Sequence, residues 1–203
     1  MEIRPMGSEQ VFQPLTREDR ITVMLYRSGI VMSTIIVSYA AFLMAGASSC
    51  AGDARIGRAA DILAWGLYAS VGMCVFFIHL YVGKFKRFLI ILYLLGLCGL
   101  IALLYIGRGS VSAALVNTPY SPLLLLPLSG CLGFVTAKEA FCFRLFEGYL
   151  LAMIMPAYLL LISLTGRGAS SGLTLIAVML VIFTLRKVFM PAAYDIGDKT
   201  AYR

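Results

Sequence analysis

Long runs of uncharged residues are the feature that most constrains this chain. Six of them follow one another, at residues 28–52, 62–83, 88–107, 119–137, 148–166 and 168–185. A charged side chain in the middle of a bilayer costs roughly 2.5–3.5 kcal/mol on insertion scales, so charges mark where apolar spans end. Each run has close to the roughly 20 residues with which a helix crosses a hydrocarbon core. The sequence therefore predicts an all-α, polytopic membrane helix bundle with about six transmembrane helices.

The composition agrees with this prediction and leaves no room for a soluble domain. Hydrophobic residues make up 61% of the 203 residues, and charged residues only 13%, whereas charged residues are about 25% of a typical soluble domain. The predicted organisation is an N-terminal segment at 1–27, a six-helix transmembrane domain at 28–188 and a C-terminal tail at 189–203.

The distribution of lysine and arginine predicts the orientation. With six spans both termini share one side, and that side carries thirteen of the 17 basic residues: Arg4, Arg17, Arg20, Arg27, Lys84, Lys86, Arg87, Lys138, Arg144, Arg186, Lys187, Lys199 and Arg203. The other side carries four: Arg55, Arg58, Arg108 and Arg167. Positive loops stay on the side of synthesis, so both termini are expected on the cytoplasmic or stromal side. Attraction to anionic lipids explains the net charge of +7, and no nucleic-acid partner is expected.

Charged and aromatic residues alternate in the segment 137–147, which joins the fourth and fifth spans. If this segment is helical, Glu139 and Glu147 share one face, and Arg144 lies within reach of Glu147. Two carboxylates on one face can bind a cation or activate water, and a Glu–Arg pair can present an oxygen to a chlorophyll magnesium. The same pattern is typical of an ordinary membrane interface and of a surface that docks a partner.

His79 lies near the positive end of the second span and is the only histidine. A neutral imidazole can ligate haem iron or chlorophyll magnesium, and it can equally be a hydrogen-bonded structural residue. A single histidine excludes a bis-histidine haem within this chain and an HExxH zinc site. The five cysteines show no CxxC pairing, so neither a metal site nor a set of catalytic residues is predicted.

Four strings together resemble one family: DRITVMLYRSGI at 19–30, FIHLYVGKFKRFL at 77–89, GFVTAKEAFCFRLFEGYLL at 133–151 and LRKVFMPAAYDIGDKTAY at 185–202. The chain is similar to the uncharacterised integral membrane proteins called domain of unknown function 2301, of cyanobacteria and plastid-bearing eukaryotes. The family pattern KEAFCFNRLE has its arginine one step away from Arg144, which weakens the transfer of any specific arginine role. The resemblance implies a photosynthetic membrane and no particular reaction.

The leading expectation is a non-catalytic thylakoid protein, an accessory subunit or assembly factor of a photosystem core. It is expected to bind membrane lipids and a few chlorophyll or carotenoid pigments, with His79, Arg144 and Glu147 as candidate pigment residues. The expected partner-docking surface consists of Lys138, Glu139, Glu147, Asp195, Asp198 and Lys199. The alternatives are a small-solute permease, in which Pro156 and the region 117–127 supply unwound backbone, and, less favoured, a membrane enzyme or a haem protein.

Overall fold

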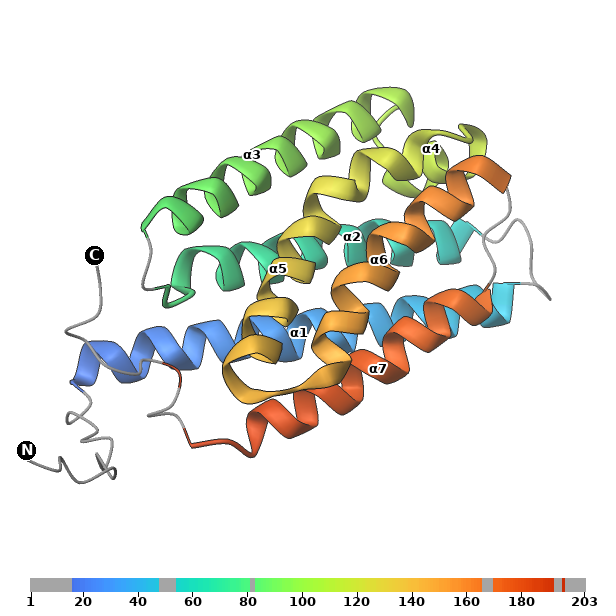
Figure 1. Ribbon diagram of the computed structural model, residues 1–203. Helices are drawn as coiled ribbons and strands as arrows, with labels where there is room; N and C mark the ends of the chain where they lie inside the picture. Colours follow the sequence, from blue (N-terminus) through green and yellow to red (C-terminus); the bar gives the residue numbers. More distant parts are fainter. Residues whose placement is uncertain (1–15, 48–53, 81–82, 166–169, 192–194, 196–203) are drawn as a thin grey trace, which may run out of the picture.

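The described part of the chain is helical, and its long helices lie side by side as a bundle (Figure 1). The computed structural model describes residues 16–47, 54–80, 83–165, 170–191 and 195. The elements are α1 (Arg17–Ala47), α2 (Ala54–Phe77), α3 (Gly83–Ile106), α4 (Val111–Asn117), the 3₁₀ helix η1 (Ser121–Leu125), α5 (Leu126–Phe143), α6 (Phe146–Thr165) and α7 (Ser170–Val188). Six of the helical segments are long and apolar enough to cross a membrane, with η1 and α5 counting as one. The predicted all-α architecture is confirmed.

The first helix begins well before its uncharged run. Thr16 and Asp19 cap it reciprocally: the Asp19 amide donates to Thr16 Oγ1 at 3.2 Å, and the Thr16 amide donates to Asp19 Oδ2 at 2.9 Å. Charged residues therefore occupy the first turns of α1, and residues 17–27 continue the span as helix. A rule based on charge finds the lipid-facing part of a helix and misses the turns that extend past it.

The region of prolines before α5 folds into two short helices. Ser110 caps α4 by accepting from the Ala113 amide at 3.1 Å, and the Ser112 amide donates to Asp61 Oδ1 of α2 at 2.7 Å. Ser121 begins η1 and donates to the Ala114 carbonyl at 2.9 Å. These bonds satisfy backbone groups that the interrupted helix leaves open, as an apolar surrounding requires.

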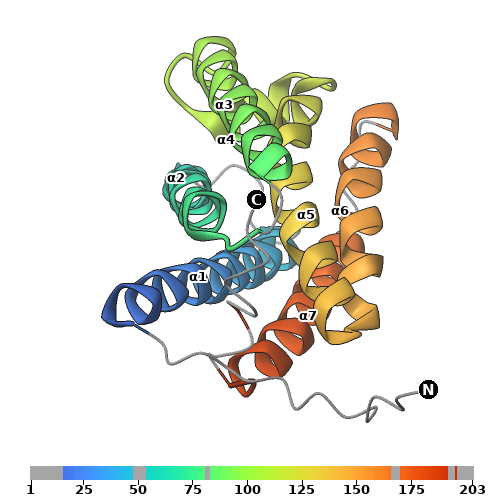
Figure 2. The ribbon, with the colours of Figure 1, turned by 60° about the vertical axis from the view of Figure 1, so that its left-hand side comes forward.

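Small residues line the contact between α5 and α6, two helices that lie side by side in Figure 2. The sequence contains a small-residue face at Ser129, Gly133 and Ala137. A Cβ atom at Gly133 would lie 3.3 Å from Cα of Ala152, and one at Gly148 would meet the Thr136 carbonyl oxygen. Because even a methyl group has little room there, the glycines set the distance between α5 and α6.

Large apolar side chains cover much of the outer surface. Exposed examples lie on every long helix: Phe42, Ile62, Ile101, Phe141, Met153, Leu164 and Leu175. In water such a surface would favour aggregation, whereas in a bilayer it faces lipid tails. The exposed surface thus agrees with the membrane location that the sequence predicts.

Candidate functional site

Charged side chains gather at one end of the bundle. This is the end where α1 begins and α7 ends, on the left of Figure 1. They come from three helices and from the segment after α7. We call them the ion cluster, and its members are Arg27 of α1, Lys138 and Glu139 of α5, Lys187 of α7, and Asp195. All belong to the end that the sequence predicts to be positive.

Glu139 is the centre of the cluster and is completely buried, with 0% of its side chain exposed. Its Oε1 accepts hydrogen bonds from the Tyr26 hydroxyl at 2.7 Å and from Lys138 Nζ at 2.7 Å. Its Oε2 is ion-paired with Lys187. A buried carboxylate persists in an apolar surrounding only when charges and donors compensate it in this way.

Lys187 joins the two carboxylates of the cluster. Its ammonium is ion-paired with both Glu139 and Asp195, and only 1% of its side chain is exposed. The ammonium also lies 4.1 Å from the ring centroid of Phe143, within the range of a cation–π contact. One side chain of α7 therefore holds both α5 and the segment that follows α7.

Arg27 fastens the chain after α7 onto α1. Its Nε donates to Asp195 Oδ2 at 2.6 Å, while Nη1 donates to the Met190 carbonyl at 2.7 Å and Nη2 to that of Pro191 at 3.1 Å. Arg27 and Asp195 are 168 positions apart in sequence. The contact thus brings the two ends of the described chain together.

The ion cluster suits structural work and the binding of anions better than the binding of metals. It contains three cations and two carboxylates, whereas a metal site needs several anionic or neutral donors. Among the described residues, no group of three or more histidine, cysteine, aspartate or glutamate side chains is placed to hold a metal ion.

The structure brings together some of the residues predicted to dock a partner. Lys138, Glu139 and Asp195 lie in one network, but both carboxylates face inward and are fully engaged. Asp198 and Lys199 lie outside the described residues. The docking role of these residues stays a prediction. Because Glu139 and Asp195 are buried, a partner would have to contact other side chains.

The segment 137–147 is not one helix, so Glu139 and Glu147 do not share a face. The chain breaks at Arg144, which has a left-handed backbone with φ of 54° and closes α5 by donating its amide hydrogen to the Ala140 carbonyl. Glu147 in the next helix accepts from Arg186 Nη1 at 2.7 and 2.9 Å. Arg144 is exposed. The candidate pigment residues Arg144 and Glu147 therefore lie near each other in sequence but have different surroundings.

His79 follows the end of α2, and its Nε2 lies 3.3 Å from Thr22 Oγ1. The Thr22 hydroxyl donates to the Asp19 carbonyl at 3.0 Å, so it accepts from the imidazole N–H. The other nitrogen, Nδ1, is buried without a hydrogen-bond partner among the described residues. Burial, and then the charges of Lys138 and Lys86, lower the pKa of His79, which favours the neutral ring. A pigment ligand at His79 stays a prediction, and Nδ1 is the nitrogen that would serve it.

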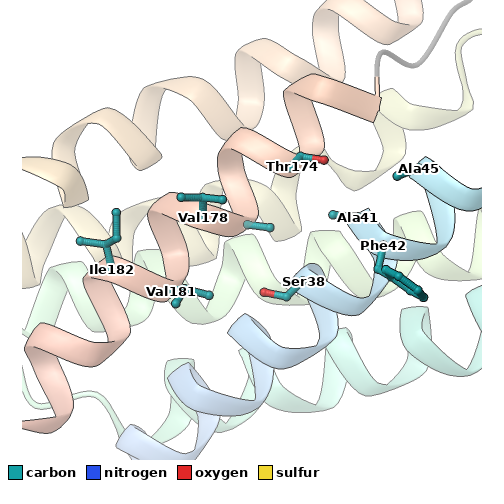
Figure 3. Close-up of a pocket in the computed structure, with 9 residues that line it drawn as sticks. Ser38, Ala41, Phe42, Ala45, Thr174, Val178, Val181 and Ile182 are labelled. Carbon is teal, nitrogen blue, oxygen red and sulfur yellow. The ribbon is translucent and has the colours of Figure 1, made fainter.

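An apolar groove runs between α1 and α7 within the apolar part of the bundle (Figure 3). Its volume is about 450 Å³, and it is lined by Ser38, Ala41, Phe42, Ala45, Thr174, Ala177, Val178, Val181 and Ile182. Small side chains form its floor, and exposed Phe42 and Val178 flank it. Its shape and apolar lining fit a hydrocarbon chain.

Two members of the ion cluster, Arg27 and Lys187, were not expected from the sequence. Neither was Tyr26, whose hydroxyl binds Glu139. Lys187 looks equivalent to its neighbour Arg186 at the end of the last span, yet 52% of the Arg186 side chain is exposed against 1% for Lys187. A signal was present, because three of the strings that resemble the family contain these residues together with Lys138, Glu139 and Asp195.

The six apolar helices and the apolar outer surface define a polytopic integral membrane protein. The family model of the uncharacterized integral membrane protein DUF2301 matches residues 73–203. The chain belongs to this family. No curated protein matches the chain, and no solved structure matches it either.

Proposed function

We propose that this protein is a non-catalytic accessory subunit or assembly factor of a photosystem, located in the thylakoid membrane of a chloroplast or cyanobacterium. It acts by binding other membrane proteins, lipids and a few chlorophyll or carotenoid pigments. Both termini face the stroma or cytoplasm. The photosynthetic location rests on the resemblance of four sequence strings, and the binding role rests on the structure.

The observation that carries the binding role is how the protein uses its carboxylates. Within the described ranges, five of them are engaged in holding the fold: Asp19, Asp61, Glu139, Glu147 and Asp195. Side chains committed to caps and ion pairs are poor candidates for proton transfer. The exposed surface is instead apolar and aromatic, which suits contact with lipid and with other membrane proteins and, among the residues described, offers no polar site for a reaction.

The turn between α5 and α6 is the best candidate for contact with a partner. Phe141, Arg144 and Phe146 are exposed there, and we call them the hairpin surface. Exposed aromatic and arginine side chains are the types that most often dominate protein interfaces. The hairpin surface replaces the buried Glu139 as the expected point of contact on this side of the membrane.

The groove between α1 and α7 supports the binding of lipid or pigment. Its volume and apolar lining suit an acyl chain, a carotenoid or the hydrocarbon tail of a chlorophyll. Visible absorbance of the purified protein tests for pigment, and replacement of His79 by leucine tests whether the imidazole ligates it. If His79→Leu leaves a pigment spectrum unchanged, that ligand assignment is wrong.

Blue-native separation of mildly solubilised thylakoid membranes tests the association itself. The protein is expected to migrate with a photosystem or with an assembly intermediate of one. Arg144→Glu should reduce this comigration, whereas Arg108→Glu should not. Arg108 is the matched control, because it is also exposed and also has a left-handed backbone, with φ of 51°. It follows the C-terminal end of α3, on the predicted opposite side of the membrane. Migration near the monomer mass at every growth stage would refute the proposal.

A further inference from the structure

Positive charge is not balanced within the ion cluster, and the imbalance is concentrated at Lys138. Arg27 is compensated by Asp195 and by carbonyl oxygens, and Lys187 lies between two carboxylates. Lys138 shares its one partner, Glu139 Oε1, with the Tyr26 hydroxyl. The cluster therefore carries one net positive charge, and Lys138 is the cation with the least compensation.

Lys138 also has hydrogen-bonding capacity to spare. An ammonium group has three donors, and among the described residues Lys138 donates one hydrogen bond, to Glu139 at 2.7 Å. Its Nζ lies 5.5 Å from the ring centroid of Tyr26, which offers no oxygen from that face. The side chain is 12% exposed, against 0% for Glu139. The edge of the cluster that a ligand can reach is therefore cationic.

The imidazole of His79 offers the complementary group. Nε2 carries the hydrogen that faces Thr22, so Nδ1 carries a lone pair. Nδ1 has no hydrogen-bond donor among the described residues. Both side chains contact α1 about one turn apart: His79 Nε2 lies 3.3 Å from Thr22 Oγ1, and Lys138 Nζ lies 5.5 Å from the ring centroid of Tyr26. The charges of Lys138 and Lys86 also lower the pKa of His79, and the carboxylates of Asp19 and Asp195 oppose them with a smaller effect. An ammonium with unused donors and a ring nitrogen that lacks a donor thus lie at the same end of the bundle.

We propose that Lys138 and His79 form a binding site for an anionic lipid headgroup that carries a free hydroxyl. A phosphate or sulfonate oxygen accepts from the Lys138 ammonium, and the hydroxyl donates to His79 Nδ1. This balances the charge of the cluster and satisfies both side chains. Nδ1 is buried in this structure, so the groups around it have to move before the hydroxyl reaches it.

The position of the site favours a lipid over a soluble anion. His79 lies two residues after the end of α2, Lys86 lies in the first turn of α3, and Lys138 is near the end of α5. All three therefore lie near the ends of helices that can cross a membrane, where lipid headgroups are expected. Exposed Phe85 and Phe88 lie beside Lys86 in sequence and can contact the acyl chains. This inference does not depend on association with a photosystem, and it excludes a pigment ligand at His79, because both would use Nδ1.

The test is retention of lipid by the purified full-length protein, counted by native mass spectrometry. The protein is reconstituted in phosphatidylcholine nanodiscs that contain a minor fraction of phosphatidylglycerol or of phosphatidylmethanol. Both minor lipids carry one negative charge, but only phosphatidylglycerol has headgroup hydroxyls. The wild type is expected to retain phosphatidylglycerol in preference to phosphatidylmethanol, and either one in preference to phosphatidylcholine.

Variants assign the effect to the two side chains. Lys138→Met should weaken phosphatidylglycerol retention about tenfold or more, as loss of a charge-assisted hydrogen bond predicts. Lys84→Met is the control: it removes one positive charge from an exposed position on α3, and it should leave retention unchanged. His79→Leu should abolish the preference for phosphatidylglycerol over phosphatidylmethanol and gives a second readout if Lys138→Met folds poorly.

Three results would overturn the proposal. Equal retention of phosphatidylglycerol and phosphatidylcholine by the wild type would show that the site does not select an anionic headgroup. Equal behaviour of Lys84→Met and a folded Lys138→Met would show that only overall charge matters. Displacement of phosphatidylglycerol by inorganic phosphate would assign the site to a soluble anion instead of a lipid.

Discussion

Replacing Lys187 by methionine tests whether the ion cluster holds the helices together. Methionine keeps much of the length of lysine and removes the charge, which leaves Glu139 and Asp195 buried without their shared cation. Removing one partner of a buried ion pair costs about 3–5 kcal/mol. Glu139 keeps Lys138 and Asp195 keeps Arg27, so we expect a loss in the free energy of unfolding near the lower end, about 3 kcal/mol.

The neighbouring residue provides a matched control. Arg186 precedes Lys187 on α7 and pairs with Glu147, but 52% of its side chain is exposed. An exposed pair is worth about 0–1 kcal/mol, so Arg186→Met should change stability little. Both variants lose one positive charge from the last turn of the same helix. The assay is unfolding in mild detergent micelles by added dodecyl sulfate, followed by loss of helical circular dichroism.

A third variant separates lost charge from lost packing. Adding Glu139→Gln to Lys187→Met removes the carboxylate charge that has lost Lys187 and should recover part of the stability. For residues in contact, the coupling energy is about 0.5–3 kcal/mol. The reasoning is wrong if Lys187→Met is no less stable than Arg186→Met. The single Glu139→Gln variant is measured as well. If the loss of stability in the double variant equals the sum of the losses in the two single variants, the two residues act independently, and the reasoning is also wrong.

Further predictions concern a titration, a close contact and the topology. Burial and nearby ammonium groups lower the pKa of His79, so its contribution to stability is present above about pH 6.5 and lost as the pH falls below that value. The proton resonance of this single imidazole should titrate below about pH 6.5, and a higher value would contradict the geometry. Gly148→Ala should destabilise α5–α6 packing by about 1–3 kcal/mol, whereas Gly46→Ala, with open space at its Cβ, should not, and equal unfolding of the two variants would contradict this. With Cys50 and the other exposed cysteine, Cys98, replaced by serine, a membrane-impermeant thiol reagent should label exposed Cys142 from the cytoplasmic or stromal side only, and labelling from the other side would invert the predicted topology.

The number of membrane-crossing helices was predictable because it depends on a local quantity. The cost of placing a charge in lipid is read from each stretch of sequence alone, so the uncharged runs locate the spans. The same rule placed the start of the first helix too late, because Glu18, Asp19 and Arg20 lie in turns of α1 that extend beyond the apolar run. The cap at Thr16 shows where the helix begins, and it lies outside what hydropathy measures.

The ion cluster was less predictable because its contacts join distant parts of the chain. The pairing of Arg27 with Asp195 spans 168 positions, and no local pattern specifies it. Two adjacent basic residues, Arg186 and Lys187, differ in exposure because successive residues of a helix point about 100° apart. Deciding which of them faces inward requires knowing which face of α7 packs on α1 and α6.

Burial of this cluster is best understood from the weak forces between helices in lipid. Lipid tails are as apolar as leucine, so apolar packing alone gives little preference for one rotation of a helix over another. Turning α7 by one residue would bring Arg186 inward and move Lys187 away from Glu139 and Asp195, leaving two buried carboxylates short of a cation. The cost of that misplacement fixes the rotation of α7. Since the same carboxylates bind Tyr26 and Arg27, it also fixes α1 and the returning segment after α7. Such a network specifies one arrangement of the bundle, and it leaves Lys138, which shares Glu139 Oε1 with the Tyr26 hydroxyl, as the least compensated cation of the cluster.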